Sequence, residues 1–166
     1  LNKPYTLTPT PRYRYCTDAG DKTQLTDGVY VKGYFWTQQG TVGWSSVAPV
    51  FCTIDLGRVE PICGASWSTA AGVAGVNWPE CLYVLASEDR KTWTYLGDLC
   101  EWGNHGQPPP QGAYATFRYA TDRLKGRGRY VCVIAAARPF CFVDEIEVWR
   151  GPDAWLTEPM SGRQAS

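Results

Sequence analysis

The sequence predicts an all-β protein, an antiparallel β-sandwich of the jelly-roll kind, and three observations carry that prediction. Short runs rich in Val, Ile, Tyr, Phe, Trp and Thr recur between clusters of Gly, Pro, Asn and Asp. Helical periodicity of apolar residues is nearly absent. The length of 166 residues suits a single domain with one core, which buries roughly two-thirds of the surface of the unfolded chain.

Several segments have the composition of strands and are bounded by turn-forming residues. Taken in chain order, they are residues 50–56, 62–69, 81–87, 93–97, 114–121, 129–136 and 142–149. About seven or eight strands of this kind are enough to build a sandwich or a jelly roll. We expect Gly57 to end the first of them in a turn, because glycine adopts backbone conformations that other residues avoid.

The segments between the predicted strands set the domain organisation. Residues 20–46 are rich in Gly, Thr and aromatic residues but alternate little, and residues 103–112 form a long polar loop. After Trp149 the pattern stops, and Pro, Gly and Ser accumulate as in a linker. We therefore predict a binding module over residues 1–150 and a tail or linker over 151–166.

Charge and hydropathy exclude several partners. The chain has 16 basic and 16 acidic residues, so no overall field draws it to nucleic acid or to an anionic membrane. No apolar run approaches the roughly 20 residues of a transmembrane helix, and the first residues have no signal-peptide pattern. We expect a mature or excised fragment of a larger protein that binds no nucleic acid.

The seven cysteines are widely spaced and include no Cys-x-x-Cys pair, so a zinc site is not predicted. Two interpretations remain open for them. Cysteines within strand-like runs can pack as small apolar residues, or some can form disulfides. The odd count leaves at least one cysteine without an intramolecular partner, and spacing alone does not define the pairing.

Five motifs occur in a fixed order along the chain. They are QLTDG (24–28), VGWSS (42–46), TIDLGRVEPI (53–62), YVLASEDRKTW (83–93) and the closing pair RYVCVIA (129–135) and FVDEIEVW (142–149). Together they resemble elements of the discoidin, or factor V/VIII C-type (F5/8 type C), domains and of the related galactose-binding-like carbohydrate-binding modules of bacteria. Arg90 stands where the family usually has Gly. Fold does not fix the ligand, so the resemblance implies the sandwich more firmly than the site.

The resemblance also implies a structural calcium ion. In many modules of this type the Asp-Gly turn and a Glu of the last strand hold Ca²⁺, and Asp27 and Glu145 occupy the matching positions. Asp18 and Asp21 are further oxygen donors nearby. In the alternative interpretation Asp27 only caps its turn. Glu145 and Glu147 are then solvated or paired with an arginine, for which the candidates are Arg58, Arg129 and Arg150.

The resembling sugar-binding modules hold their ligand on loops at one end of the sandwich. A pyranose stacks its C–H face on an aromatic ring while its hydroxyls need oriented polar groups. We favour Trp36 and Trp78 as the platform, and the alternative is that they only close the sandwich end. Other loop aromatics are Tyr34, Phe35, Trp44 and Trp102, of which Trp44 is expected to pack. Polar candidates are Gln38, Gln39, Asn77, Glu80, Asn104 and His105.

Catalysis is not predicted. The chain has a single histidine and lacks a Gly-x-Ser-x-Gly elbow, a phosphate-binding glycine loop and a pair of metal-binding histidines. Two opposed carboxylates of a glycosidase cannot be identified from spacing. A small sandwich with a linker-like tail is an unfavourable frame for such a pair.

The sequence therefore predicts a lectin-like, non-catalytic accessory module that anchors an attached enzyme or surface protein to a glycan. We expect it to be secreted or extracellular, which includes a periplasmic or cell-surface location. One alternative is a discoidin-like module for protein or phospholipid surfaces, which would use Tyr34, Phe35 and Trp36 beside Lys32. Another is a structural accessory domain of a larger enzyme.

Overall fold

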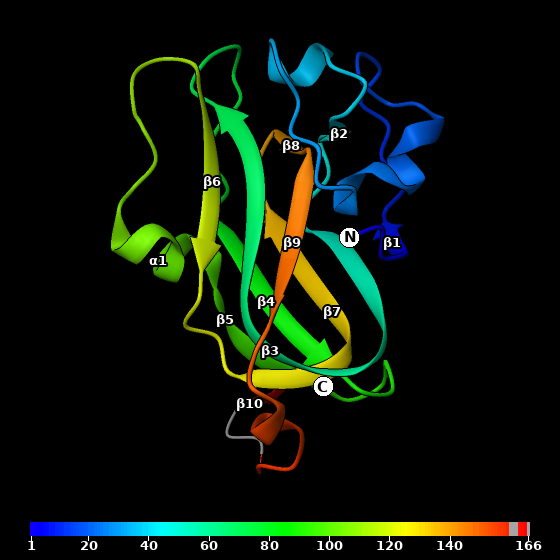
Figure 1. Cartoon of the computed structure of the whole chain (residues 1–166). Coiled ribbons are helices and arrows are strands. Elements are labelled where there is room, and N and C mark those ends of the chain that lie inside the picture. Colours follow the sequence, from blue (N-terminus) through cyan, green and yellow to red (C-terminus); the bar gives the residue numbers. More distant parts are fainter. Residues whose placement is uncertain (160–162, 166) are drawn as a thin grey trace.

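Antiparallel strands make up most of the regular secondary structure, which confirms the predicted all-β sandwich (Figure 1). The computed structural model describes residues 1–159 and 163–165. The helices are α1 (Leu99–Trp102) and the 3-10 helices η1 (Ala19–Lys22), η2 (Gln24–Thr26), η3 (Phe35–Thr37), η4 (Gly103–Gly106) and η5 (Asp153–Leu156). The strands are β1 (Tyr5–Thr8), β2 (Val42–Ser45), β3 (Val50–Ala71), β4 (Cys81–Ser87), β5 (Trp93–Asp98), β6 (Ala115–Thr121), β7 (Gly126–Ala136), β8 (Phe140–Val143), β9 (Glu145–Arg150) and β10 (Arg163–Ala165).

Strand β3 belongs to both layers of the sandwich. Its first part pairs with β1 and β7, and its second part pairs with β6 and β9. The pairing with β7 shifts register between Asp55 and Glu60, where Gly57 has a φ of +90°. The prediction of two strands separated by a turn was therefore wrong. The glycine allows a bend inside one long strand, which curves round the base of the sandwich in Figure 1.

The two layers follow from this shared strand. One layer has the order β1-β3-β7-β4-β5-β10, while β6 and β9 flank the second part of β3 in the other. Strands β2 and β8 form a separate two-stranded ladder. Because one long strand runs through both layers, its inward residues fix how the layers face each other.

The last predicted strand, 142–149, is two strands that pair with different partners. Strand β8 pairs with β2 and β9 pairs with β3, and the chain changes partner at Asp144. The Asp144 amide donates to the carbonyl of Ser68 at 3.2 Å, and its carboxylate accepts from the amide of Val31 at 2.8 Å. The strand-like segment FVDEIEVW continues across Asp144 and gives no sign of this change in the sequence. Strands β1 and β2 were also missed, because four residues are too few to show a period.

The main core lies between the layers. Trp67 of β3 is fully buried and lies between its ladder partners Tyr119 of β6 and Ile146 of β9. Trp44, expected to be a packing residue, is also buried, and its indole N–H donates to the carbonyl of Pro9 at 2.7 Å. The polar atom of this large side chain is therefore satisfied without water.

A second, smaller core holds the loops at the end of the sandwich where β3 finishes. Apolar side chains from several loops meet those of β3 and β8 there, and we call this cluster the loop-end core. Its buried members are Cys16, Phe35, Trp36, Ala70, Ala71, Val76 and Phe142. Loops far apart in sequence are thus fixed to one another by burial of apolar surface.

The segment after residue 150 begins by folding back onto the module. The amide of Gly151 donates to the carbonyl of Pro61 at 2.9 Å, and Arg127 donates to the carbonyl of Trp155 at 3.1 Å. The backbone of β10 pairs with β5. Residues 160–162 and 166 of the predicted tail lie outside the described residues. The division of the chain at residue 150 stays a prediction.

All seven cysteines are free thiols in the structure, and Cys16, Cys52, Cys132 and Cys141 are buried. Burial raises the pKa of the Cys16 and Cys141 thiols to about 12, because a thiolate loses its hydration there. These thiols stay protonated at neutral pH and pack as small apolar groups. Within the described part of the chain, every helix is too short to cross a membrane.

Candidate functional site

One end of the sandwich gathers five loops around the loop-end core. We call this surface the loop end, and it lies at the top of Figure 1. It is formed where β3 finishes and β6 begins, since Ala71 pairs with Ala115. Loop residues supported by rigid strands are the usual location of binding sites in such folds. The segments of the loop end are residues 9–16, 29–41, 72–80, 107–114 and 137–139.

Tyr34 presents the most accessible aromatic ring among the predicted loop-end residues. It lies just before η3 and is 41% exposed. Its ring meets the edge of Trp36 at a centroid distance of 4.7 Å and lies tilted against Tyr114 at 5.1 Å. Its carbonyl accepts from the Thr37 hydroxyl at 2.8 Å and from the Gln38 amide at 3.2 Å. The ring therefore packs against two neighbouring rings and stays partly exposed to solvent.

Tyr114 fixes the loop that carries Tyr34. Its hydroxyl accepts from the amide of Phe35 at 3.1 Å and donates to the carbonyl of Gly33 at 3.3 Å. One side chain thus satisfies two backbone groups of a loop that has no ladder to satisfy them. The predicted strand over 114–121 includes this residue, whereas β6 begins at Ala115. Nothing in the sequence indicates the supporting role of Tyr114.

Trp36, one of the two favoured platforms, lies in the loop-end core. It is 4% exposed, stacks on Phe142 at a centroid distance of 5.5 Å and meets Tyr114 edge-on. Because its ring contacts other side chains and is almost fully buried, Trp36 agrees with the alternative interpretation, in which it only closes the end of the sandwich. Its predicted ligand contact stays a prediction, but Tyr34 is better placed for one.

Trp78 and Asn77 border a shallow hollow at the loop end. Trp78 is half-buried, meets Phe117 and Tyr119 edge-on, and donates its indole N–H to the carbonyl of Pro110 at 3.0 Å. Asn77 is exposed and donates to the carbonyl of Arg138 at 2.9 Å. The hollow lies between the loops of residues 72–80 and 107–114. It is lined by Gly72, Val73, Gly75, Val76, Asn77, Trp78, Gln111 and Gly112.

Trp102 and His105 lie on a flank, apart from the loop end, with α1 and η4 beside β6 (Figure 1). Trp102 is 38% exposed and packs over Gly97, where an added Cβ would come within 2.9 Å of its ring. His105 is exposed, while Asn104 donates to the carbonyl of Arg118 at 2.8 Å. The structure therefore separates these predicted ligand residues from Tyr34, Gln38, Asn77 and Trp78. Gln39 and Glu80 are exposed.

The segment Arg12–Tyr15 was not predicted to belong to the site, yet it lies at the loop end. Tyr13 packs against the edges of Phe142, at a centroid distance of 4.8 Å, and of Tyr15, at 5.6 Å. Tyr15 remains exposed beneath the guanidinium of Arg14, which lies 4.7 Å from its ring centre. Alternating Tyr and Arg residues after a proline were the signal available in the sequence.

Asp27 and Glu145, the predicted calcium ligands, lie near each other. Glu145 is 1% exposed, and one carboxylate oxygen accepts from the amide of Gly28 at 3.0 Å, while the other has no hydrogen-bond partner among the residues that the structure describes. Burial raises the pKa of Glu145 to about 8, and the negative charge of Asp27 adds to the shift. A buried, unpartnered carboxylate oxygen beside a second carboxylate fits a hard divalent cation.

The remaining ligands of such a cation would have to be backbone carbonyls, hydroxyls or water. Among the residues that the structure describes, no three His, Cys, Asp or Glu side chains gather into a metal site. Asp27 does cap its turn, since its carboxylate accepts from Val29 at 2.8 Å. The predicted arginine partners contact other acids. Arg58 pairs with Glu60, Arg129 with Asp55, Arg150 with Glu60 and Asp153, and Glu147 pairs with Arg118.

Comparison with known proteins identifies the fold. No protein-family model matches the chain, and no curated protein sequence matches it. Among solved structures, it is similar to a Clostridium perfringens module, CpGH89CBM32-6, with 15% identity over 90% of this chain and 94% of that one, at a TM-score of 0.56. The module CpGH89CBM32-5 of the same organism, solved with GalNAc-β-1,3-galactose, has 16% identity over 89% and 95% at a TM-score of 0.53.

A fucolectin from striped bass serum also has this fold, with 13% identity over 92% of this chain and 48% of the other, at a TM-score of 0.53. The chain therefore has the galactose-binding-like, discoidin-type β-sandwich, which confirms the fold that the motifs implied. Identities this low establish the architecture, and the ligand must be argued from the residues of this chain.

Two substitutions test whether Trp36 is a core residue and Tyr34 a surface residue of the loop end. We expect Trp36→Ala to lower the free energy of unfolding by about 3–5 kcal/mol, because it leaves a large cavity in the loop-end core. Tyr34→Ala should cost less than about 1.5 kcal/mol, since the ring is partly exposed. Urea denaturation of both variants gives the comparison, and equal losses would contradict the assignment of Trp36 to the core.

Proposed function

We propose that this protein is a non-catalytic module that binds a glycan at the loop end, with Tyr34 as the stacking platform. The observation that carries the proposal is an exposed tyrosine ring fixed by Tyr114 and by the buried Trp36, at the end of the sandwich that also holds a shallow hollow. A rigid ring needs little ordering when a ligand stacks on it, so less binding energy is lost.

The chemistry of the surroundings suits a sugar. Asn77 uses its amide N–H₂ in a protein contact, which leaves its side-chain oxygen to accept from a hydroxyl. Gln111 is exposed across the hollow from Asn77 and can donate or accept. Polar groups beside an aromatic ring are the combination that a pyranose requires.

The fold comparison supports this proposal. One similar structure contains a disaccharide, GalNAc-β-1,3-galactose, and another is a lectin by name. By analogy, we propose that the chain acts as an accessory module that holds an attached enzyme or surface protein at a glycan outside the cell. The analogy concerns the kind of ligand, and the identity of the sugar is not transferred.

The loop end supports binding in preference to hydrolysis. A glycosidase needs two carboxylates that face each other across the bond to be broken. Glu80 is the single acidic residue in the segments that form the loop end. We therefore propose that any catalytic activity belongs to other parts of the protein from which this module comes.

The discoidin-like alternative of insertion into a phospholipid surface has less support. It relied on Tyr34, Phe35 and Trp36 as an exposed apolar tip, but Phe35 and Trp36 are buried in the loop-end core. Tyr34 alone offers little apolar surface to a bilayer.

We propose calcium at Asp27 and Glu145 as a structural ion. It would satisfy the unpartnered oxygen of Glu145 and hold the turn at Gly28 against β9. The ion would stabilise the fold and would not contact the sugar. The residues that bind it hold the backbone in place, whereas the proposed sugar contacts lie on the loop-end surface.

The binding proposal predicts the outcome of a glycan-array screen of the labelled protein. The wild type should bind a defined glycan class, and Tyr34→Ala should weaken that binding at least about tenfold, because the stacking contact is lost. Trp102→Ala is the matched control, since it removes an exposed tryptophan from the flank and should change binding less than about twofold.

Two results would contradict the proposal. Absence of binding to any glycan would contradict the function itself. Binding lost in Trp102→Ala but retained in Tyr34→Ala would keep the function but place the site on the flank beside α1.

The calcium proposal predicts a metal-dependent melting temperature. At Ca²⁺ about 100-fold above its Kd the gain should be about 5–10 °C relative to protein in EDTA, because the ion binds only the folded state. Glu145→Gln should abolish the gain, whereas the exposed-residue control Glu101→Gln should keep it. Equal melting curves with Ca²⁺ and EDTA for the wild type would refute the proposal.

A further inference from the structure

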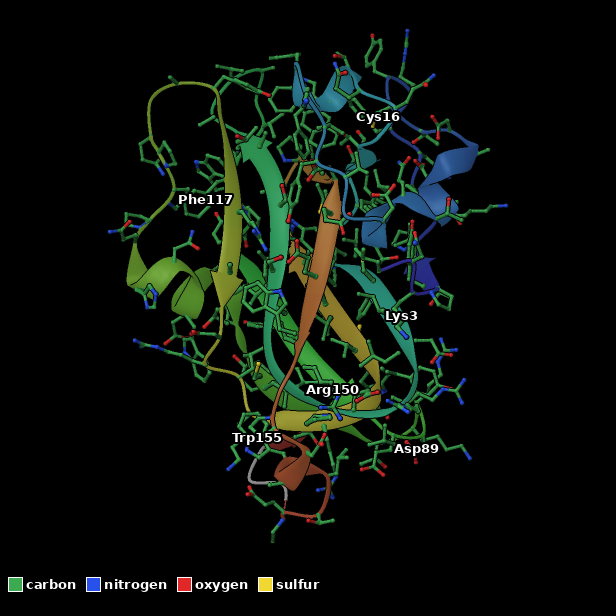
Figure 2. All side chains as sticks on the ribbon, in the orientation of Figure 1. Lys3, Cys16, Asp89, Phe117, Arg150 and Trp155 are labelled. Atoms are coloured by element: carbon green, nitrogen blue, oxygen red, sulfur yellow. The ribbon has the colours of Figure 1, made fainter. Side chains whose placement is uncertain are left out.

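The charges of this neutral chain are unevenly distributed. Seven ion pairs join charged residues in the described part of the chain, and none of them includes a residue of the loop end. Most lie at the opposite end, where Figure 2 shows Asp89, Arg150 and Trp155. A net charge of zero therefore conceals a local imbalance.

The loop end carries an excess of positive charge. Arg12, Arg14, Lys32 and Arg138 are all exposed, and each lacks an acidic partner within the described residues. Glu80 is the only acid in the same segments. Asp18 and Asp21, whose charges add to the burial that raises the pKa of Cys16, adjoin these segments, as does Asp144, which accepts from the amide of Val31. Asp21 and Asp144 are buried, so Asp18 is the exposed one of these three. Like charges gathered on one surface raise the local potential, which favours an anionic ligand.

Three of these cations belong to segments that contact each other. The amides of Arg12 and Tyr13 both donate to the carbonyl of Gly43 at 3.1 Å, and the Tyr13 ring lies 5.7 Å from that of Phe140. Arg138 precedes Phe140 by two residues, and its carbonyl accepts from Asn77 of the hollow. Residues 12–14 and Arg138 therefore border one surface.

This basic surface continues to the proposed platform. The Tyr13 ring meets Phe142 at a centroid distance of 4.8 Å, Phe142 stacks on Trp36 at 5.5 Å, and Trp36 meets Tyr34 at 4.7 Å. This chain of ring contacts connects residues 12–14 to the proposed platform. Arg14 lies over the exposed ring of Tyr15 on the same segment.

We propose that the loop end binds an anionic glycan, a sugar that bears a carboxylate or a sulfate ester, with Arg14 and Arg138 contacting the anionic group while Tyr34 stacks on the ring. This inference rests on the proposed function and specifies its ligand class. A guanidinium matches the planar oxygens of a carboxylate or sulfate with two parallel hydrogen bonds. A neutral glycan would make no use of these unpaired cations.

The experiment uses an array of neutral, uronate-bearing, sialylated and sulfated glycans, probed at low and high NaCl concentrations. A second arm titrates the protein with hexagalacturonate and with its carboxyl-reduced counterpart, which has the same linkages without charge. The anionic glycans should give the stronger signal, and salt should weaken it through screening.

The variants distinguish binding that depends on the charges of the loop end from binding that depends on the charge of the whole protein. Arg14→Gln with Arg138→Gln should reduce binding of the anionic glycans about tenfold, from two exposed charge contacts. Arg123→Gln removes an exposed arginine of the opposite end that has no acidic partner among the described residues, and it should change binding less than about twofold. Tyr34→Ala should weaken binding of anionic and neutral glycans alike.

The outcomes distinguish this inference from the proposed function. Salt-independent binding of a neutral glycan that the double arginine variant retains would overturn the anionic ligand and leave the glycan module intact. Binding to no glycan on the array would overturn both. Anionic binding that Arg123→Gln weakens as much as the double variant would overturn the assignment to the loop end.

Discussion

The bend in β3 is the constraint on which the rest of the structure depends. Asp55 holds it with one carboxylate, which accepts from the amide of Gly57 at 2.8 Å and from the guanidinium of Arg129 at 2.8 and 2.9 Å. The Arg129 contact lowers the pKa of Asp55, so the carboxylate remains charged at neutral pH. Because one strand supplies both layers, this bend orients Trp67 within the core and sets where the strand finishes.

The end of that strand determines the position of the loops. Ala70 and Ala71 belong to the loop-end core, in which Trp36 stacks on Phe142. Tyr34 remains partly exposed, and Tyr114 fixes the backbone on both sides of it at Gly33 and Phe35. The loop-end core thus both buries Trp36 and supports the exposed ring of Tyr34, because the buried Trp36 ring restricts the movement of the Tyr34 ring packed against it.

Much of the fold could be predicted from the sequence, and less of the site. Strands such as β4 and β7 were identified because their residues alternate or cluster between turn formers, while the change of partner at Asp144 depends on contacts distant in sequence. Loop aromatics could be identified as candidates, but composition does not tell a buried Trp36 from an exposed Tyr34. Net charge does not show how charges are distributed, because ion pairs join acids and bases at one end, while the cations of the loop end have no acidic partner among the described residues.

The most direct test of the account is an amide chemical-shift titration of the ¹⁵N-labelled protein with the glycan that gives the strongest array signal. The account predicts that the largest shifts fall at residues 33–38, 72–78 and 111–114, together with Arg14 and Arg138. Shifts concentrated in α1 and η4, or on the outer face of β4 and β5, would show that the ligand binds elsewhere and would contradict the loop end as the binding surface.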